Sequence, residues 1–235
     1  RVEEPADAAT AGTYAPGAQV ERHTGPAPLI HASGLWGEVV GALEARVQLP
    51  SGATLMIEST EALWAIDVNA AAARGHGGSA ASATGVNLEA ATRIAREIRR
   101  RDIAGTILID FLDQTDAGDR DALTNRLREA LGADRRYLRI SGWTGLGLCE
   151  LARRRVEPGL LERLGPAAMP TAAGRAARLL ADLVGQAASP RGHVATVDAA
   201  TAEILRASIA GTDLEPRLSI VVDAGAKTAH RLERG

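Results

Sequence analysis

The chain has 235 residues, a net charge of −2 and 46% hydrophobic residues, few of them aromatic. It can bury one sizeable core, or one core and a small second domain, and its charge excludes a chain that binds nucleic acid over its whole surface. The single Cys149 excludes a disulfide framework and a CxxC zinc site, and its apolar neighbours favour a partly buried position in a helix.

No apolar run approaches the ~18 residues of a membrane span, and no signal peptide is visible. We therefore expect a cytoplasmic protein. Residues 1–30, rich in Ala, Gly, Pro and Glu, show no period and predict a flexible lead-in. From Leu35 to Leu49 apolar residues recur every four positions, which predicts an amphipathic helix.

Two strands that form a hairpin are predicted next, at Thr54–Glu58 and Ala62–Asn69. The Gly-rich segment 70–85, which contains His76, is long enough for a mobile active-site loop. Asn87 is a candidate N-cap for a following helix, in which Glu89 suits the positive first turn.

A buried strand is predicted to end at Asp110, after the apolar run Ile107–Ile109. Asp119 is a candidate cap for another helix, which has Leu123, Leu127 and Leu131 on its inner side and ends at Gly132. A strand at Tyr137–Ser141 and a helix over Gly142–Arg155 are predicted to follow.

Beyond a stretch rich in Pro and Gly, the sequence predicts a small β-α-β unit. It begins with a helix at Thr171–Ala187, followed by a strand at His193–Val197, a helix at Ala199–Ile209 and a strand at Leu218–Val222. Strands that alternate with helices indicate an α/β protein with a mixed sheet and flanking helices, plus a small C-terminal α/β domain. The predicted domains are a lead-in (1–30), a larger α/β domain (31–157), a linker (158–170) and the small domain (171–235).

Asp67 and Asp110 both stand near the ends of apolar strands. If these strands are neighbours in one sheet, both carboxylates emerge at the same edge, where they repel each other unless a proton or a cation lies between them. Mg²⁺ prefers such oxygen ligands together with substrate phosphate. The pattern suggests metal-assisted phosphoryl transfer, although aspartates at strand ends also occur in loops and caps without chemistry.

Three long motifs occur in order: ESTEALWAIDVN, GVNLEAATRIAREIRRRDIAGTILIDFLD and SGWTGLGLCELARRR. Together with the upstream TGPAPLIHASGL they resemble the catalytic domain of the ribonuclease E/G family. The resemblance implies a fold like that of deoxyribonuclease I or ribonuclease H, and the cleavage of single-stranded RNA inside the chain, in bacterial RNA processing or decay.

The family's functional residues transfer by motif. Asp67 and Asp110 resemble the Mg²⁺ ligands, and Asn69 resembles the residue that holds a water or places the phosphate. Asp113 matches a further acid of the same motif, for which a turn-stabilising role is an equal alternative. RNA contacts are expected from four arginines: Arg74, Arg135, Arg136 and Arg139.

The sequence also departs from the family pattern. These residues include neither its OB-fold RNA-binding domain nor its 5′-end-sensing segment, and Val156–Pro170 stands in place of the zinc-binding cysteines. A homo-oligomer would therefore lack a zinc link. Tyr137 replaces an arginine that senses the RNA 5′-phosphate. These departures leave open an inactive RNA-binding or scaffold paralogue, and a general metal phosphoesterase is a third alternative.

Overall fold

The structure is a computed structural model, and it describes residues 17–24, 29–70, 82–113, 116–132, 134, 136–166, 170–185, 192–212, 214–226 and 231–234. It divides the chain into two compact units, Ala42–Pro166 and the remainder. We call the first the sheet unit. Most of the expected lead-in, and residues 71–81 of the expected Gly-rich loop with His76, lie outside the described residues.

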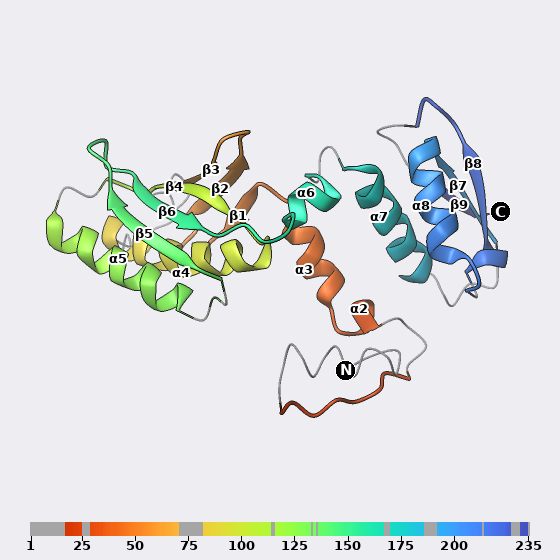
Figure 1. Ribbon diagram of the computed structural model, residues 1–235, viewed down its shortest axis with the longest axis horizontal. Coiled ribbons are helices and arrows are strands. Elements are labelled where there is room, and N and C mark those ends of the chain that lie inside the picture. The colour runs from red at the N-terminus through yellow and green to blue at the C-terminus, as the bar shows by residue number, and fades with distance from the viewer. Residues whose placement is uncertain are drawn as a thin grey trace. The chain divides into compact units, whose positions relative to one another are not determined.

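The sheet unit contains a six-stranded mixed sheet in the order β1-β2-β3-β4-β6-β5 (Figure 1). The pair β3–β4 is parallel, and the other neighbours are antiparallel. Its strands are β1 (Arg46–Gln48), β2 (Thr54–Ser59), β3 (Trp64–Asn69), β4 (Gly105–Asp110), β5 (Leu138–Trp143) and β6 (Cys149–Arg153). Its helices are α4 (Ala83–Arg100), α5 (Ala117–Leu131) and α6 (Leu160–Leu164).

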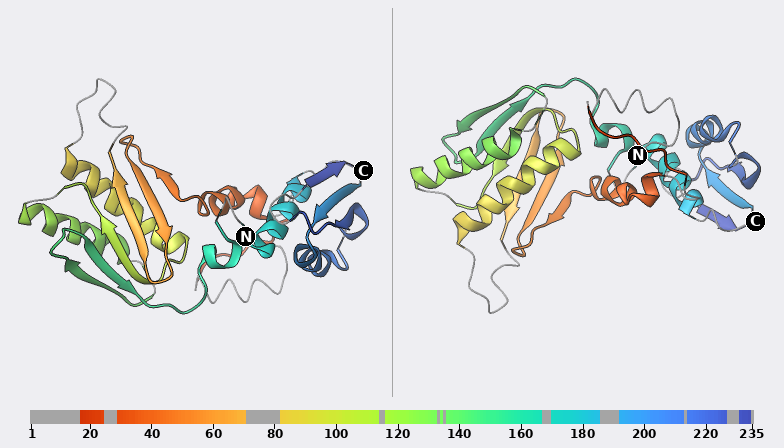
Figure 2. Two further views of the ribbon diagram at one scale, coloured as in Figure 1. Left: turned by 90° about the horizontal axis from the view of Figure 1, so that it is seen from above. Right: turned by 90° about the horizontal axis from the view of Figure 1, so that it is seen from below.

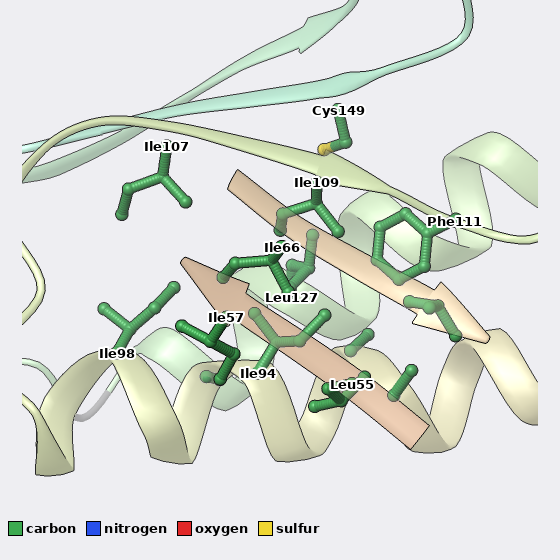
Figure 3. Close-up of a cluster of buried hydrophobic side chains, with 14 of the residues drawn as sticks. Leu55, Ile57, Ile66, Ile94, Ile98, Ile107, Ile109, Phe111, Leu127 and Cys149 are labelled. Carbon is green, nitrogen blue, oxygen red and sulfur yellow. The ribbon is translucent and has the colours of Figure 1, made fainter. Parts of the chain in front are cut away.

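Helices α4 and α5 lie side by side on one face of this sheet (Figure 2). Strand β3 alternates strictly between buried and exposed residues, as expected of a strand with one covered face. The core between helices and sheet is aliphatic, with Ile94, Ile98 and Leu127 fully buried against Ile107 and Ile109 (Figure 3). The opposite face, which we call the open face, carries the exposed residues of β3 and β4.

The remaining elements belong to the other unit. They are α2 (Leu29–Ala32), α3 (Leu35–Gly41), α7 (Ala172–Gly185), β7 (His193–Val197), α8 (Ala199–Ile209), the 3-10 helix η1 (Glu215–Arg217), β8 (Leu218–Val222) and β9 (Arg231–Arg234). β7 pairs with β8 in parallel and with β9 in the antiparallel sense. No helix among the described residues is long and apolar enough to span a membrane.

The predicted mixed α/β class is confirmed, and so are the bounds of β7, α8 and β8. The helix predicted over Leu35–Leu49 is wrong in its second half, because it ends at Gly41 and Arg46–Gln48 forms β1. Val47 and Leu49 are buried two residues apart, which is the period of a strand. Apolar residues four positions apart fit the period of a helix and also that of a strand, so this spacing does not distinguish the two structures.

The helix predicted over Gly142–Arg155 is also wrong, because this segment completes β5 and forms β6 of a hairpin. Cys149, Leu151 and Arg153 alternate inward, so Cys149 is a buried strand residue. Burial, and then the charge of Glu150, raises the pKa of its thiol to about 12, which excludes a reactive thiolate at neutral pH.

The alternating pattern of β6 is not apparent in the sequence because a charged residue, Arg153, occupies one of its inward-facing positions. Its guanidinium is bound by Asp134 at 2.6 Å and by Asp102 at 2.7 Å, so the buried charge is compensated. Helix α6 lies within the range of the predicted linker. The Leu160 amide donates to the Arg101 carbonyl at 3.0 Å, which ties α6 to the end of α4.

A second buried charge, Glu97 on α4, accepts hydrogen bonds from Arg93, Arg100 and Arg101 at 2.8–2.9 Å. The side chains of Glu97 and Arg101 are both fully buried. Burial alone would raise the pKa of Glu97, but the hydrogen bonds from Arg101 and Arg100 outweigh it, and the pKa lies below its usual value. Arg101 also donates to the Glu44 carbonyl, so the cluster joins α4 to the chain before β1.

We expect Glu97→Gln to lower the free energy of unfolding by about 3 kcal/mol, because it leaves buried Arg101 without its counter-charge. The control Glu129→Gln, whose pair with Arg126 is exposed, should cost less than about 1 kcal/mol. Urea unfolding of both variants measures the difference.

Because the pKa of Glu97 is lowered in the folded state, its contribution to the free energy of unfolding is complete above the ordinary value of 4.5 and is lost as the pH falls below it. Equal stability of the two variants would contradict this role.

Candidate active site

Two carboxylates lie side by side on the open face of the sheet. Asp67 of β3 and Asp110 of β4 are direct register partners across the parallel pair. Neighbouring strands lie about 4.8 Å apart, and partners in register point to the same face. The residues before each of them, Ile66 and Ile109, are buried under the helices, which directs both acids to the exposed side.

The charges at this edge act on one another. Partial burial raises the pKa of Asp110, and the negative charges of Asp67 and Asp113 raise it further. The three carboxylates therefore form one electrostatic group although they come from two strands and the loop after β4. A proton or a bound cation would reduce the repulsion among these carboxylates.

Asn69 lies two residues beyond Asp67 and is exposed with it on the open face. Its side-chain amide donates a hydrogen bond to the Asp67 carboxylate. The contact orients one oxygen of Asp67, and the Asn69 amide carries an oxygen that could serve as a neutral ligand.

Asn87 is a residue of this region that the sequence interpretation misplaced. Ser82 is the N-cap of α4, and Asn87 lies fully buried inside the helix. Its amide donates to the Leu112 carbonyl at 2.8 Å, and its oxygen accepts from the Leu112 amide at 3.0 Å. Asn87 thus fixes the loop between Asp110 and Asp113. A polar residue within an apolar helical stripe was the available signal.

The starts of α4 and α5 are joined at the same end of the sheet. Thr84 donates to Asp119 at 2.9 Å, and Asp116, not the predicted Asp119, caps α5. Glu89 accepts from the Ser51 amide at 3.3 Å, in the second turn of α4. Both helices therefore direct their positive N-terminal ends toward the edge where β3 and β4 finish.

Neither of the two predicted RNA-binding arginines that the structure describes, Arg136 and Arg139, lies at the acids. Arg74 and Arg135 lie outside the described residues. Arg136 pairs with Asp102 at 2.8 Å, before the start of β4 and so at the other end of this strand from Asp110. Arg139 is exposed on β5 and is in register with Ala152 of β6, which is in register with Thr106 of β4. Thr106 lies four residues before Asp110, which is about 13 Å along the strand.

The donor set suits a hard cation more than a soft one. It consists of two carboxylates in register, a neighbouring amide and Asp113 on the adjoining loop. Oxygen ligands of this kind are those of Mg²⁺. Among the residues that the structure describes, no group of three or more His, Cys, Asp or Glu side chains is arranged to hold a metal.

Comparison with known proteins confirms the family to which the sequence motifs point. The model of the ribonuclease E/G family matches residues 6–156. The chain is 42% identical to ribonuclease E of Escherichia coli K12 over 144 residues, which cover 61% of this chain and 14% of that protein. It is 38% identical to ribonuclease E of Haemophilus influenzae and 34% identical to ribonuclease G of E. coli K12. The matched regions are 15% and 29% of those two proteins, so the chain spans only a minor part of these relatives.

We expect Asp67→Asn to lower the pKa of Asp110, because it removes one of the negative charges that raise it. The pKa should stay above the ordinary 3.8, since burial and Asp113 remain. A carboxyl-carbon NMR titration in EDTA measures it. Glu58→Gln, on β2 in register with Ala65, is the control and should leave the pKa of Asp110 in place. An unchanged pKa in Asp67→Asn would show that the carboxylates are not coupled.

Proposed function

This chain belongs to the ribonuclease E/G family, and from this we propose that it is an Mg²⁺-dependent endoribonuclease that cuts single-stranded RNA. The proposal includes a deoxyribonuclease I-like fold for the sheet unit and a role in RNA processing or decay in the bacterial cytoplasm. The observation that carries it is the register of Asp67 with Asp110 on the open face.

Asp67 and Asp110 would hold the cation, with Asp113 as support. When bound, Mg²⁺ supplies positive charge that stabilises the phosphate in the transition state and activates water for attack. Two carboxylates leave most coordination positions for solvent and substrate phosphate, as is usual for Mg²⁺. Asn69 would hold Asp67 in one orientation through its amide hydrogen bond.

The open face provides access for the substrate. The exposed side of β3 lies opposite α4 and α5, so these helices support the acids from behind without covering them. The loop fixed by Asn87 keeps Asp113 at a set position relative to Asp110. Preorganised charges of this kind stabilise a transition state without reorganising during the reaction.

The proposal predicts that Asp67→Asn or Asp110→Asn reduces cleavage by orders of magnitude, because both acids serve one cation. The double variant should lose little more than either single variant. Melting temperatures without Mg²⁺ should stay level or rise, since a repulsion between like charges is removed. Cleavage of a labelled single-stranded RNA, with Mg²⁺ and with EDTA, measures the effect, and Glu58→Gln serves as the control.

Wild-type cleavage by either variant would refute the two-carboxylate mechanism. A wild-type chain that binds RNA but does not cut it in Mg²⁺ would favour the inactive RNA-binding or scaffold alternative.

RNA binding itself should be weak and electrostatic. We expect a dissociation constant on the order of 10⁻⁴–10⁻⁶ M at physiological salt, which rises steeply with salt because bound counterions are released from RNA. Fluorescence anisotropy over a salt series measures it. Tight binding that does not respond to salt would contradict a site built from a few arginines.

A further inference from the structure

An irregularity in β5 sets the direction of the Trp143 side chain at the end of this strand. The pairing of β5 with β6 shifts register between Ile140 and Gly142, and Gly142 has a φ of +117° that other residues rarely adopt. Such bulges change the direction of the following side chain and are common beside functional sites. Trp143 then pairs with Cys149 on the helix side of the sheet, where it stays half-buried.

The Trp143 ring holds an arginine. The Arg120 guanidinium carbon lies 5.4 Å from the ring centroid, within the range of a cation–π contact. The indole N–H donates to the Thr124 hydroxyl at 3.1 Å, one turn further along α5, which fixes the ring. Arg120 therefore has a defined position near the start of α5.

This pair adjoins the candidate active site. Phe111 follows Asp110 directly, and its ring centroid is 5.9 Å from that of Trp143. Figure 3 shows Phe111 beside Ile109 in the buried cluster. Phe111, Trp143 and Arg120 thus contact one another in turn on the helix side of the sheet, at the end where β4 finishes and Asp110 faces the opposite side.

The turn between β5 and β6 completes the surface. Gly147 has a φ of +87°, and a Cβ at this position would lie 3.8 Å from Nη2 of Arg120, so Arg120 also contacts the turn. Leu146, at the tip of the turn, is 90% exposed. An apolar side chain and a guanidinium therefore lie near the end of the sheet where β4 finishes, on the helix side, while Asp67 and Asp110 lie at the same end on the open face.

We propose that Arg120, held by Trp143, binds the single-stranded substrate where it passes the end of the sheet that carries the acids, with its plane stacked on an unpaired base and its N–H groups on a phosphate. Unpaired bases stack on arginine planes and aromatic rings, whereas bases in a duplex are not available for such stacking. Leu146 adds apolar contact for the same base. The inference rests on the proposed function, since it names a substrate contact for that site. Arg120 is the contact residue and Trp143 a positioning residue.

The test is binding of a fluorescein-labelled single-stranded RNA in EDTA, where no cleavage occurs. Arg120→Ala should raise the dissociation constant about fivefold or more, the loss of one stacked base, and reduce the salt slope by roughly 0.7, the loss of one phosphate contact. Arg120→Lys should keep the salt slope and still bind more weakly, because it retains the charge without the plane. Arg126→Ala, on the same helix with an exposed side chain, is the matched control and should bind like the wild type.

Trp143→Phe tests the positioning role. It keeps an aromatic ring but loses the indole N–H bond to Thr124, so it should weaken RNA binding while the melting temperature changes little. In Mg²⁺, Arg120→Ala and Trp143→Phe should raise KM and leave kcat nearly unchanged, which a general loss of structure would not do.

The outcomes separate this inference from the proposed function. If the wild type cleaves RNA and Arg120→Ala binds and cleaves like Arg126→Ala, the contact is refuted and the function stands. If the wild type cuts nothing in Mg²⁺ but Arg120→Ala still weakens binding, the function is refuted and the RNA contact stands. Equal loss of binding in Arg120→Ala and Arg126→Ala would show only general electrostatics and would also overturn the contact.

Discussion

The parallel pairing of β3 with β4 is the constraint on which the candidate active site depends. Each strand alone would present one exposed aspartate of no particular meaning. Parallel strands must be joined by a crossover, and α4 provides it while burying its apolar stripe against the sheet. Because side chains alternate along a strand, a slip of one residue would turn one of the two acids into the core, so burial of Ile66 and Ile109 fixes the register.

The charged residues at the two ends of β4 differ in the charge of their neighbours. Where α4 ends and β4 begins, Glu97, Arg101 and Arg153 are buried, and every one of them has an opposite charge in contact. At the other end, Asp67 and Asp110 are exposed, and each has a like charge as neighbour. The first end contributes stability through paired charges, and the second retains a repulsion between like charges that a proton or a cation would reduce.

The likeness to known proteins covers one part of the chain. The family model ends at residue 156, close to the end of the sheet unit. The elements α7, β7, α8 and β8 form their own hydrophobic cluster and lie outside the matched residues. The acids of the open face and the pair Arg120–Trp143 all belong to the sheet unit, within the matched residues.

The sequence by itself determined the elements in which local pattern and burial agree. Strict alternation gave β3, and the leucines of α5 at spacings of four gave its inner side. Motif order indicated the family, and the strand-end acids suggested a shared site. Only the tertiary structure decided the rest. Arg153 could occupy an inward strand position because Asp134 and Asp102, distant in sequence, compensate its charge. Asn87 became a loop anchor because Leu112 lies beside it. Such pairings depend on contacts between residues far apart in the chain, which local periodicity does not contain.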